Sequence, residues 1–155
     1  MNTIDVLKTN PHFAALAPSE IEAVAHAFSA PARADRAVFF REGDRAEAIY
    51  LLLRGEVTAK HKERLREHVI RHFGPGDLFG LTGLIENAPR RATCTSDGEC
   101  EVATMRREAF QLLRQQSAPV AYAFQKALAS QLARDFRGTD ARLRALLPRT
   151  ADGRI

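Results

Sequence analysis

The sequence predicts a mainly β domain of the α+β class, an antiparallel barrel or jelly roll with helices at both ends. Short β-type runs separated by glycine turns fill residues 37–106, and several short strands at regular intervals are typical of such a barrel. Helical periodicity marks the residues before and after this stretch. The chain has 155 residues, enough for one domain that buries roughly two-thirds of its unfolded surface.

The composition is that of an ordinary soluble protein, with 45% hydrophobic and 27% charged residues. No apolar run approaches the roughly 18 residues that a membrane-spanning helix needs, and the N-terminus lacks the apolar core of a signal peptide. We therefore expect a cytoplasmic protein without membrane contact. The net charge of +4 is small and the basic clusters contain acidic residues, so a solvated surface is expected rather than a nucleic-acid site.

Helices are predicted at the N-terminus. Pro11 and Pro18 stand where the first turn of a helix tolerates proline. From Pro18 onward, apolar residues recur at i, i+3, i+4 and i+7, which predicts one buried stripe that ends before Pro31. The stripe consists of Ile21, Val24, Ala25 and Phe28.

Six strands are predicted in the central part, each rich in β-branched or aromatic residues and bounded by turn residues. A polar hairpin tip is expected at residues 63–67. The predicted strands are Val38–Phe40, Ile49–Leu53, Val57–Lys60, His68–Phe73, Ala92–Ser96 and Cys100–Met105.

The two cysteines, Cys94 and Cys100, are predicted on the arms of a hairpin that turns at Asp97-Gly98. A two-residue turn would pair Thr95 with Cys100 and Cys94 with Glu101. The thiols would then point to opposite faces of the sheet, which argues against a disulfide and fits a reduced pair.

Two helices are predicted after residue 106. The first spans Arg107–Gln116, and the second spans Ala118–Arg137 with apolar residues at steps of four. Gly138 is expected to end the long helix, and a short final helix and a loose tail would follow. The predicted division is therefore a main domain over residues 1–137 and a small segment over residues 138–155.

No catalytic or metal-binding arrangement stands out. A metal-dependent barrel enzyme would need a His-x-His pattern, which the chain lacks. It also lacks a Gly-x-Ser-x-Gly elbow, a Walker loop and a zinc-type cysteine spacing. We therefore expect no enzyme, no metal and no cofactor. The histidines considered are His12, His26, His61, His68 and His72.

The stretch from Phe79 to Thr93, FGLTGLIENAPRRAT, is the strongest candidate for a binding site. It joins two β-type runs through a short amphipathic helical turn that begins with small residues. Such a start leaves backbone N–H groups without partners, and the helix dipole adds positive charge there. An arginine close in space adds the planar donor fork that phosphate oxygens match. The stretch therefore predicts a phosphate site.

The motifs in and before this stretch resemble those of the cyclic-nucleotide-binding domain family, which includes the bacterial catabolite activator and the regulatory subunit of protein kinase A. The stretch is similar to the family's phosphate-binding cassette, in which Phe-Gly opens a short helix and Pro-Arg-x-Ala-Thr follows a variable loop. The resemblance covers about residues 10–136. The matching motifs are Glu42-Gly43-Asp44, Gly55-Glu56-Val57, Gly74–Asp77, Phe79–Leu84 and Pro89–Thr93.

The resemblance implies a jelly roll with a C-terminal helical lid and a ligand such as cAMP, cGMP or a related phosphate compound. In the family the last helix closes over the ligand's base and often forms a dimer contact, so Phe124 and Leu128 are the lid candidates. The implied partners are the nucleotide, an unidentified protein effector and a second copy of the chain. The implied ligand-binding residues are Phe79, Gly80, Leu81, Thr82, Gly83, Leu84, Arg90, Arg91 and Ala92.

Two positions depart from the family pattern. The family holds the ribose 2′-hydroxyl with a glutamate, where this chain has Leu81, and Arg91 replaces a small residue after the phosphate-binding arginine. Losing one charge-assisted hydrogen bond would cost on the order of 1.5–3 kcal/mol. The phosphate half of the site is therefore expected to be present and the ribose half impaired.

Either Arg90 or Arg91 could bind the phosphate, because strand alternation lets only one of them point into the barrel. Arg90 fits the Pro-Arg-x-Ala-Thr pattern without a gap and is favoured, and Arg91 would then point outward. The structural alternative is that Arg90 pairs with a nearby carboxylate such as Asp77 or Glu86.

Three functions follow. The first is a stand-alone sensor, in which a phosphate ligand binds Arg90 and the C-terminal helix moves onto the cassette. The second is a degenerate interaction module that binds no nucleotide, with Leu81 filling the ribose space. The third is the sensor part of a DNA-binding regulator, because too few residues follow the long helix for a DNA-reading unit.

Overall fold

The computed structural model describes the backbone of residues 2–146 and the side chains of residues 2–134. Its centre is a jelly roll of two four-stranded antiparallel sheets, with strand orders β1-β8-β3-β6 and β2-β7-β4-β5. The predicted fold class is thereby confirmed. The first sheet contains β1 (Ala32–Asp35), β3 (Ala48–Arg54), β6 (Leu78–Phe79) and β8 (Glu99–Arg106), and the second contains β2 (Val38–Phe40), β4 (Val57–Glu63), β5 (Arg66–Phe73) and β7 (Thr93–Ser96).

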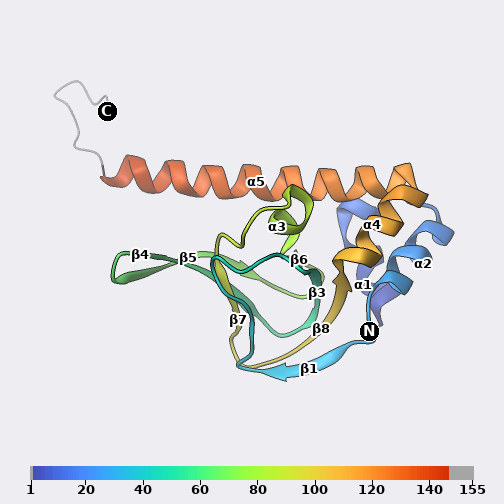
Figure 1. The fold of residues 1–155 in the computed structure, drawn as a ribbon, viewed down its shortest axis with the longest axis horizontal. Helices are drawn as coiled ribbons and strands as arrows, with labels where there is room; N and C mark the ends of the chain where they lie inside the picture. Colours follow the sequence, from blue (N-terminus) through green and yellow to red (C-terminus); the bar gives the residue numbers. More distant parts are fainter. Residues whose placement is uncertain (1, 147–155) are drawn as a thin grey trace.

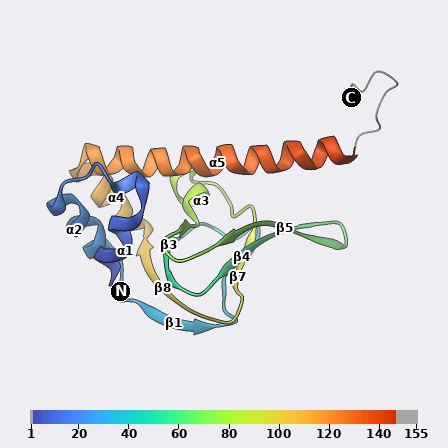
Figure 2. The same cartoon turned by 180° about the vertical axis from the view of Figure 1, so that it is seen from behind.

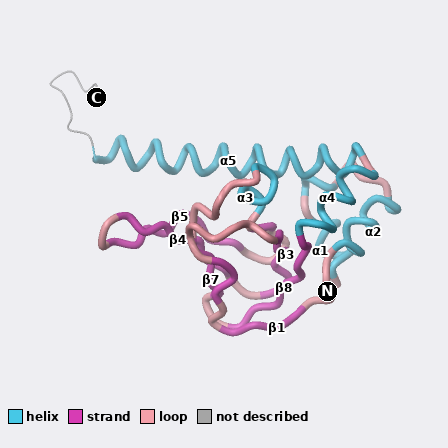
Figure 3. Tube along the Cα trace, in the orientation of Figure 1, coloured by secondary structure: helices cyan, strands magenta, loops and turns pink. Residues whose placement is uncertain are grey.

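Helices cover one end and one side of the barrel (Figure 1). The short helices α1, α2 and α4 gather at one end, and the long helix α5 runs along the side that α3 occupies, as the view from behind also shows (Figure 2). Figure 3 shows the β4–β5 hairpin projecting away from the helical end. The helices are α1 (Thr3–Thr9), the 3-10 helix η1 (Pro11–Phe13), α2 (Pro18–Ala27), α3 (Leu81–Glu86), α4 (Arg107–Gln116) and α5 (Ala118–Leu146).

Two of the N-terminal helices, η1 and α2, begin at the prolines where the sequence predicts a helix start, and α2 ends at Ala27, before Pro31. Pro11 and Pro18 each occupy the first turn of their helix, where the missing N–H costs nothing. In α2 the apolar stripe faces inward, since Ile21 and Val24 are buried and Phe28 follows at 6% exposure. Burial of this stripe anchors the helical end of the molecule.

The buried apolar residues form two clusters, which strand β3 separates because its side chains alternate between its two faces. Ile49 and Leu51 lie in the cluster shared with the helices, which we call the helical core, and Leu52 lies in the cluster between the sheets, which we call the barrel core. The helical core also includes Leu7, Phe13, Val24, Leu81, Leu84, Phe110, Val120 and Phe124. The barrel core also includes Val57, Phe73, Phe79, Cys94, Cys100 and Val102.

The predicted hairpin between the cysteine strands is wrong. β7, which carries Cys94, pairs with β2 and β4, whereas β8, which carries Cys100, pairs with β1 and β3. The chain therefore crosses from one sheet to the other at Asp97-Gly98. Both cysteines are buried and free, and both belong to the barrel core, so the predicted placement of the thiols on opposite faces of one sheet is wrong as well.

The predicted end of the long helix at Gly138 is also wrong, because α5 continues to Leu146. A glycine in a helix costs about 1 kcal/mol relative to alanine but keeps its N–H and causes no clash, so good helix formers on both sides carry the helix through. The tail predicted to be loose, residues 149–155, lies outside the described residues, and the division at residue 137 stays a prediction. Over residues 2–146, no helix combines the length and the apolar character that crossing a bilayer requires.

Candidate functional site

The cassette begins at β6, passes through Gly80 and α3, and reaches β7 through a loop that carries the two arginines. Arg90 is 5% exposed and turns into the protein. The Arg91 side chain is 65% exposed, and its Nη2 lies 3.0 Å from Glu86 Oε2. The two arginines therefore have the expected opposite orientations, and the ligand-binding role of each stays a prediction.

The Arg90 guanidinium is held by three neutral groups. Its Nη1 donates to the carbonyl oxygen of Gly80 at 2.7 Å, and its Nη2 donates to that of Ala48 at 2.6 Å. Its central carbon lies 3.9 Å from the centre of the Phe40 ring, in cation–π range. These contacts fix the plane of the guanidinium. We call Arg90 and these three partners the arginine corner.

Neither of the two carboxylates predicted as alternative partners of Arg90 pairs with its guanidinium. Asp77 Oδ2 accepts a hydrogen bond from Gly74 N at 2.8 Å, and Glu86 pairs with Arg91 instead. The predicted alternative of an Arg90 ion pair with either acid is therefore wrong. The backbone explains the difference, because the carbonyls of β3 and of the turn before α3 already surround the guanidinium.

Arg90 is thus a buried cation whose contacts carry no negative charge. Its Nε is buried and has no hydrogen-bond partner in the described part of the chain; Arg107 Nε shares this condition, but Arg107 is partly exposed. Burial lowers the pKa of Arg90, yet a guanidinium stays charged in proteins. A buried charge is costly unless it is paired. An oxyanion that reaches the corner would supply the missing charge and accept from the free Nε–H.

The loop between β2 and β3 holds the backbone of Arg90. Gly43 N donates to Arg90 O, and Arg90 N donates to Asp44 O, both at 2.8 Å. The same loop is tied to its surroundings through Glu42, as described next. The Glu-Gly-Asp motif at residues 42–44 therefore positions the arginine, a role that its glycine punctuation alone did not reveal.

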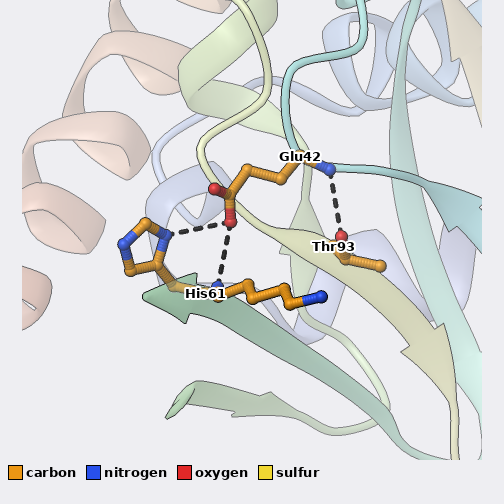
Figure 4. Close-up of polar contacts among 4 residues, drawn as sticks. Glu42, His61 and Thr93 are labelled. Carbon is orange, nitrogen blue, oxygen red and sulfur yellow. Dashed lines mark hydrogen bonds and ion pairs between the residues drawn. The ribbon is translucent and has the colours of Figure 1, made fainter. Parts of the chain in front are cut away.

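Glu42 links this loop to β4 and β7 (Figure 4). Its backbone N donates to Thr93 Oγ1 at 3.0 Å, and its Oε1 accepts from Lys62 N at 3.2 Å. The same oxygen lies 2.9 Å from His61 Nδ1. The Lys62 N–H and His61 both lower the pKa of Glu42 below its ordinary value. The carboxylate form of Glu42 is therefore the form that holds the loop.

Aromatic rings line the barrel beside the arginine corner. Tyr50 stacks on Phe79 with ring centres 5.1 Å apart, and Phe40 lies 6.0 Å from Tyr50. Phe39 and Phe73 pack edge-on or tilted against Phe79 at 5.2 and 5.6 Å. Burial raises the pKa of Tyr50. Flat apolar surfaces next to a buried cation are suited to a ligand that combines an anion with a flat ring.

At the start of α3, the apolar side chains pack into the helical core. Leu81 is fully buried and belongs to the helical core, together with Leu84. Gly80 has a φ of +82°, and a Cβ on it would stand 2.9 Å from Arg90 Nη1. A Cβ on Gly83 would stand 3.0 Å from the Ala46 side chain. Glycine is therefore required at these positions so that the cassette can approach the arginine and the preceding loop.

The predicted lid residues lie in the helical core. Phe124 packs against Phe13 and Phe110 with ring centres 5.2 Å away in each case, and Leu128 is 9% exposed. Another α5 residue, Gln131, connects the helix to the cassette, because its Nε2 donates to Leu78 O at 2.9 Å. A lid role for Phe124 and Leu128 stays a prediction.

Two further residues were predicted to bind the ligand, Thr82 and Ala92. Thr82 is partly exposed in the first turn of α3, and Ala92 packs against the barrel core. Among the described residues, no three His, Cys, Asp or Glu side chains come together as a metal site.

Sequence reasoning missed three contributors: Ala48, Phe40 and Gln131. Ala48 acts through its carbonyl, which gives no side-chain signal. Phe40 was predicted only as part of a short strand, Val38–Phe40. Gln131 had a readable signal, since it follows Leu128 by three residues and Phe124 by seven and so lies on the buried face of the helix.

Known proteins are similar to this chain in sequence and in fold. A family model described as the cyclic nucleotide-binding domain matches residues 34–117. A cAMP-dependent protein kinase regulatory subunit from Colletotrichum orbiculare is 31% identical over 109 residues, 70% of this chain and 27% of that protein. A cyclic AMP receptor protein from Thermus thermophilus is 29% identical over 151 residues, 96% of this chain and 68% of that protein. A global regulator from Xanthomonas campestris, described as c-di-GMP responsive, has a solved structure with 30% identity and a TM-score of 0.71, covering 85% of this chain and 66% of that one.

The chain spans about a quarter of the length of the kinase regulatory subunit that it resembles. The family model covers more than half of the chain, and the matched residues include the cassette, the arginine corner and most of both sheets. By its sequence and by its fold, this chain belongs to the cyclic nucleotide-binding domain family.

Proposed function

We propose that this chain is a regulatory sensor that binds a cyclic nucleotide, cAMP or cGMP, at the arginine corner and passes the signal on through its C-terminal helix. It acts by binding and not by catalysis. The observation that carries the proposal is the buried Arg90 guanidinium, which has neutral partners and an Nε–H without an acceptor. A phosphodiester supplies both the negative charge and the acceptor.

A short path of contacts supports transmission to α5. Arg90 binds Gly80 O, and two residues earlier Leu78 O accepts from Gln131 of α5. A ligand that draws the guanidinium away from Gly80 would move the strand that Gln131 holds. Differential affinity for the two arrangements would then shift the population of α5 positions. The outputs that we propose are a protein effector and a second copy of the chain bound along this helix.

The direct test is isothermal titration of the purified chain with cAMP, cGMP and c-di-GMP, the last because one relative is described as responsive to it. Arg90→Leu should weaken binding at least about hundredfold, because it removes the buried charge. Arg91→Leu is the matched control and should bind within about threefold of the parent, because Arg91 lies outside. Unfolding curves of both variants would confirm that they fold.

Two outcomes would overturn the proposal: no heat with any of the three ligands at millimolar concentration, or unchanged binding by the folded Arg90→Leu variant. The first outcome would favour a second candidate, an interaction module without nucleotide. That candidate is supported by the two carbonyl bonds that Arg90 already makes and by the burial of Leu81. A third candidate, the sensor part of a longer DNA-binding regulator, uses the same site and is tested by a DNA-shift assay on the full gene product.

A further inference from the structure

We infer that the site recognises its ligand through the phosphodiester and a flat ring and does not read the sugar 2′-hydroxyl. The inference rests on the proposed function, since it concerns the same site. It predicts that a ribose and a 2′-deoxyribose ligand bind almost equally well.

Strong recognition of a ligand hydroxyl requires a carboxylate that is free to accept from it. The five acids of the cassette and of the loops beside it already have partners, and Glu47 pairs with Arg45 at 3.2 Å. Asp44 Oδ2 accepts from Arg41 N at 2.9 Å, and Asp77 Oδ2 accepts from Gly74 N. Glu42 binds Lys62 N and His61, and Glu86 binds Arg91 at the surface. None of these carboxylates forms a hydrogen bond or ion pair with the Arg90 guanidinium in the described part of the chain, and Asp44 contacts Arg90 through its backbone oxygen.

The side chains closest to the arginine corner add no such group. Leu81, at the start of α3, is apolar and fully buried in the helical core. Phe40 and Phe79 present ring faces and edges. The corner therefore offers one charged element, the guanidinium, and its surroundings are apolar apart from Tyr50, whose ring lies 6.0 Å from that of Phe40.

Thr82 is the remaining polar side chain in the first turn of α3, where it is partly exposed. A bond between two neutral hydroxyls changes affinity by less than about tenfold. A carboxylate that accepts from the ligand would change it by about tenfold or more. The loss of affinity on removing the ligand's 2′-hydroxyl therefore distinguishes recognition by a neutral hydroxyl from recognition by a carboxylate.

The experiment is isothermal titration of the unmodified chain with cAMP, 2′-deoxy-cAMP and adenosine. We expect the dissociation constants of the two cyclic nucleotides to agree within about threefold, and adenosine, which lacks the phosphate, to bind at least a hundredfold more weakly. Thr82→Val, which keeps the shape and removes the hydroxyl, should leave the ratio of the two constants unchanged within about twofold.

A loss of tenfold or more for 2′-deoxy-cAMP, with tight binding of cAMP, would overturn the inference and leave the proposed function intact. If that loss disappeared in Thr82→Val, the hydroxyl would be read by Thr82. Binding of neither cyclic nucleotide would overturn the proposed function and this inference with it, and equal binding of adenosine would do the same, because the phosphate would then play no part.

Discussion

The two ends of the cassette have opposite surroundings although they touch the same glycine. At one end Arg90 is buried among backbone carbonyls and an aromatic ring, with its charge uncompensated. At the other end Leu81 is buried among apolar side chains of the helical core. At the Arg90 end, the buried Nε–H has no hydrogen-bond acceptor in the described part of the chain. At the Leu81 end, the buried side chain is fully packed in the core. Substitutions at the Leu81 end should therefore change stability, and those at the Arg90 end should change recognition.

The largest effect on stability is expected from Leu81→Ala. Removing a fully buried leucine side chain should lower the free energy of unfolding by about 2–5 kcal/mol, because it leaves a cavity in the helical core. Urea unfolding followed by circular dichroism measures the change. Thr82→Ala, one residue along the same turn, is the control and should cost less than about 1 kcal/mol. A loss below 1 kcal/mol for Leu81→Ala would mean that Leu81 is not a core residue.

A smaller effect, measured as the difference between two glycine variants, is expected where the two ends meet, at Gly80. Gly80→Ala introduces a Cβ at a φ of +82°, 2.9 Å from Arg90 Nη1 and 3.3 Å from Ala48 O. Gly43→Ala is a matched control, because Gly43 has a φ of +89° and no atom within 4 Å of the added Cβ. Both changes should cost about 1–2 kcal/mol of backbone strain.

The difference between these two variants isolates the clash with the arginine corner. Gly80→Ala should lose about 1–3 kcal/mol more than Gly43→Ala, because the Arg90 guanidinium and the Ala48 carbonyl oxygen must both shift to admit the added Cβ. It should also weaken cAMP binding where Gly43→Ala leaves it nearly unchanged, because the guanidinium is displaced. Equal unfolding free energies for the two variants in urea would show that the corner tolerates a Cβ.

The sequence was sufficient to locate this site but not to describe its contacts. The order of the glycine motifs and the Pro-Arg-x-Ala-Thr run located the cassette. Strand alternation predicted that only one of the two arginines turns inward, and the ungapped fit to that run favoured Arg90. The acceptors of Arg90 are carbonyls of Ala48 and Gly80, and any residue type carries a carbonyl. Such contacts depend on how distant segments meet, which local patterns do not record.

Elements with weak local signals were missed for a related reason. β1 (Ala32–Asp35) alternates alanine with charged residues, is mostly exposed and pairs with β8 alone. β6 has two residues, and its pairing with β3 creates it. The crossing of the chain between β7 and β8 was read as a hairpin because Asp-Gly is a common two-residue turn. In each case the partner strand decides the structure, and the partner is far away in the sequence.

The smallest effect concerns the loop that holds the Arg90 end, and it depends on pH. The hydrogen bond from Lys62 N and the proximity of His61 lower the pKa of Glu42 from its ordinary value of 4.5. Because the folded-state pKa is the lower one, the stabilisation is fully present above pH 4.5 and is lost as the pH falls through the folded-state value.

Glu42→Gln keeps an acceptor but removes the charge. Its deficit in unfolding free energy relative to the parent should therefore be present at neutral pH and close as the pH falls below 4.5. Urea titrations between pH 7 and pH 3 measure this, with Glu47→Gln as the control, because Glu47 pairs with Arg45 at the surface. If the difference in unfolding free energy between Glu42→Gln and the parent were the same at pH 3 as at pH 7, the charge of Glu42 would not hold the loop.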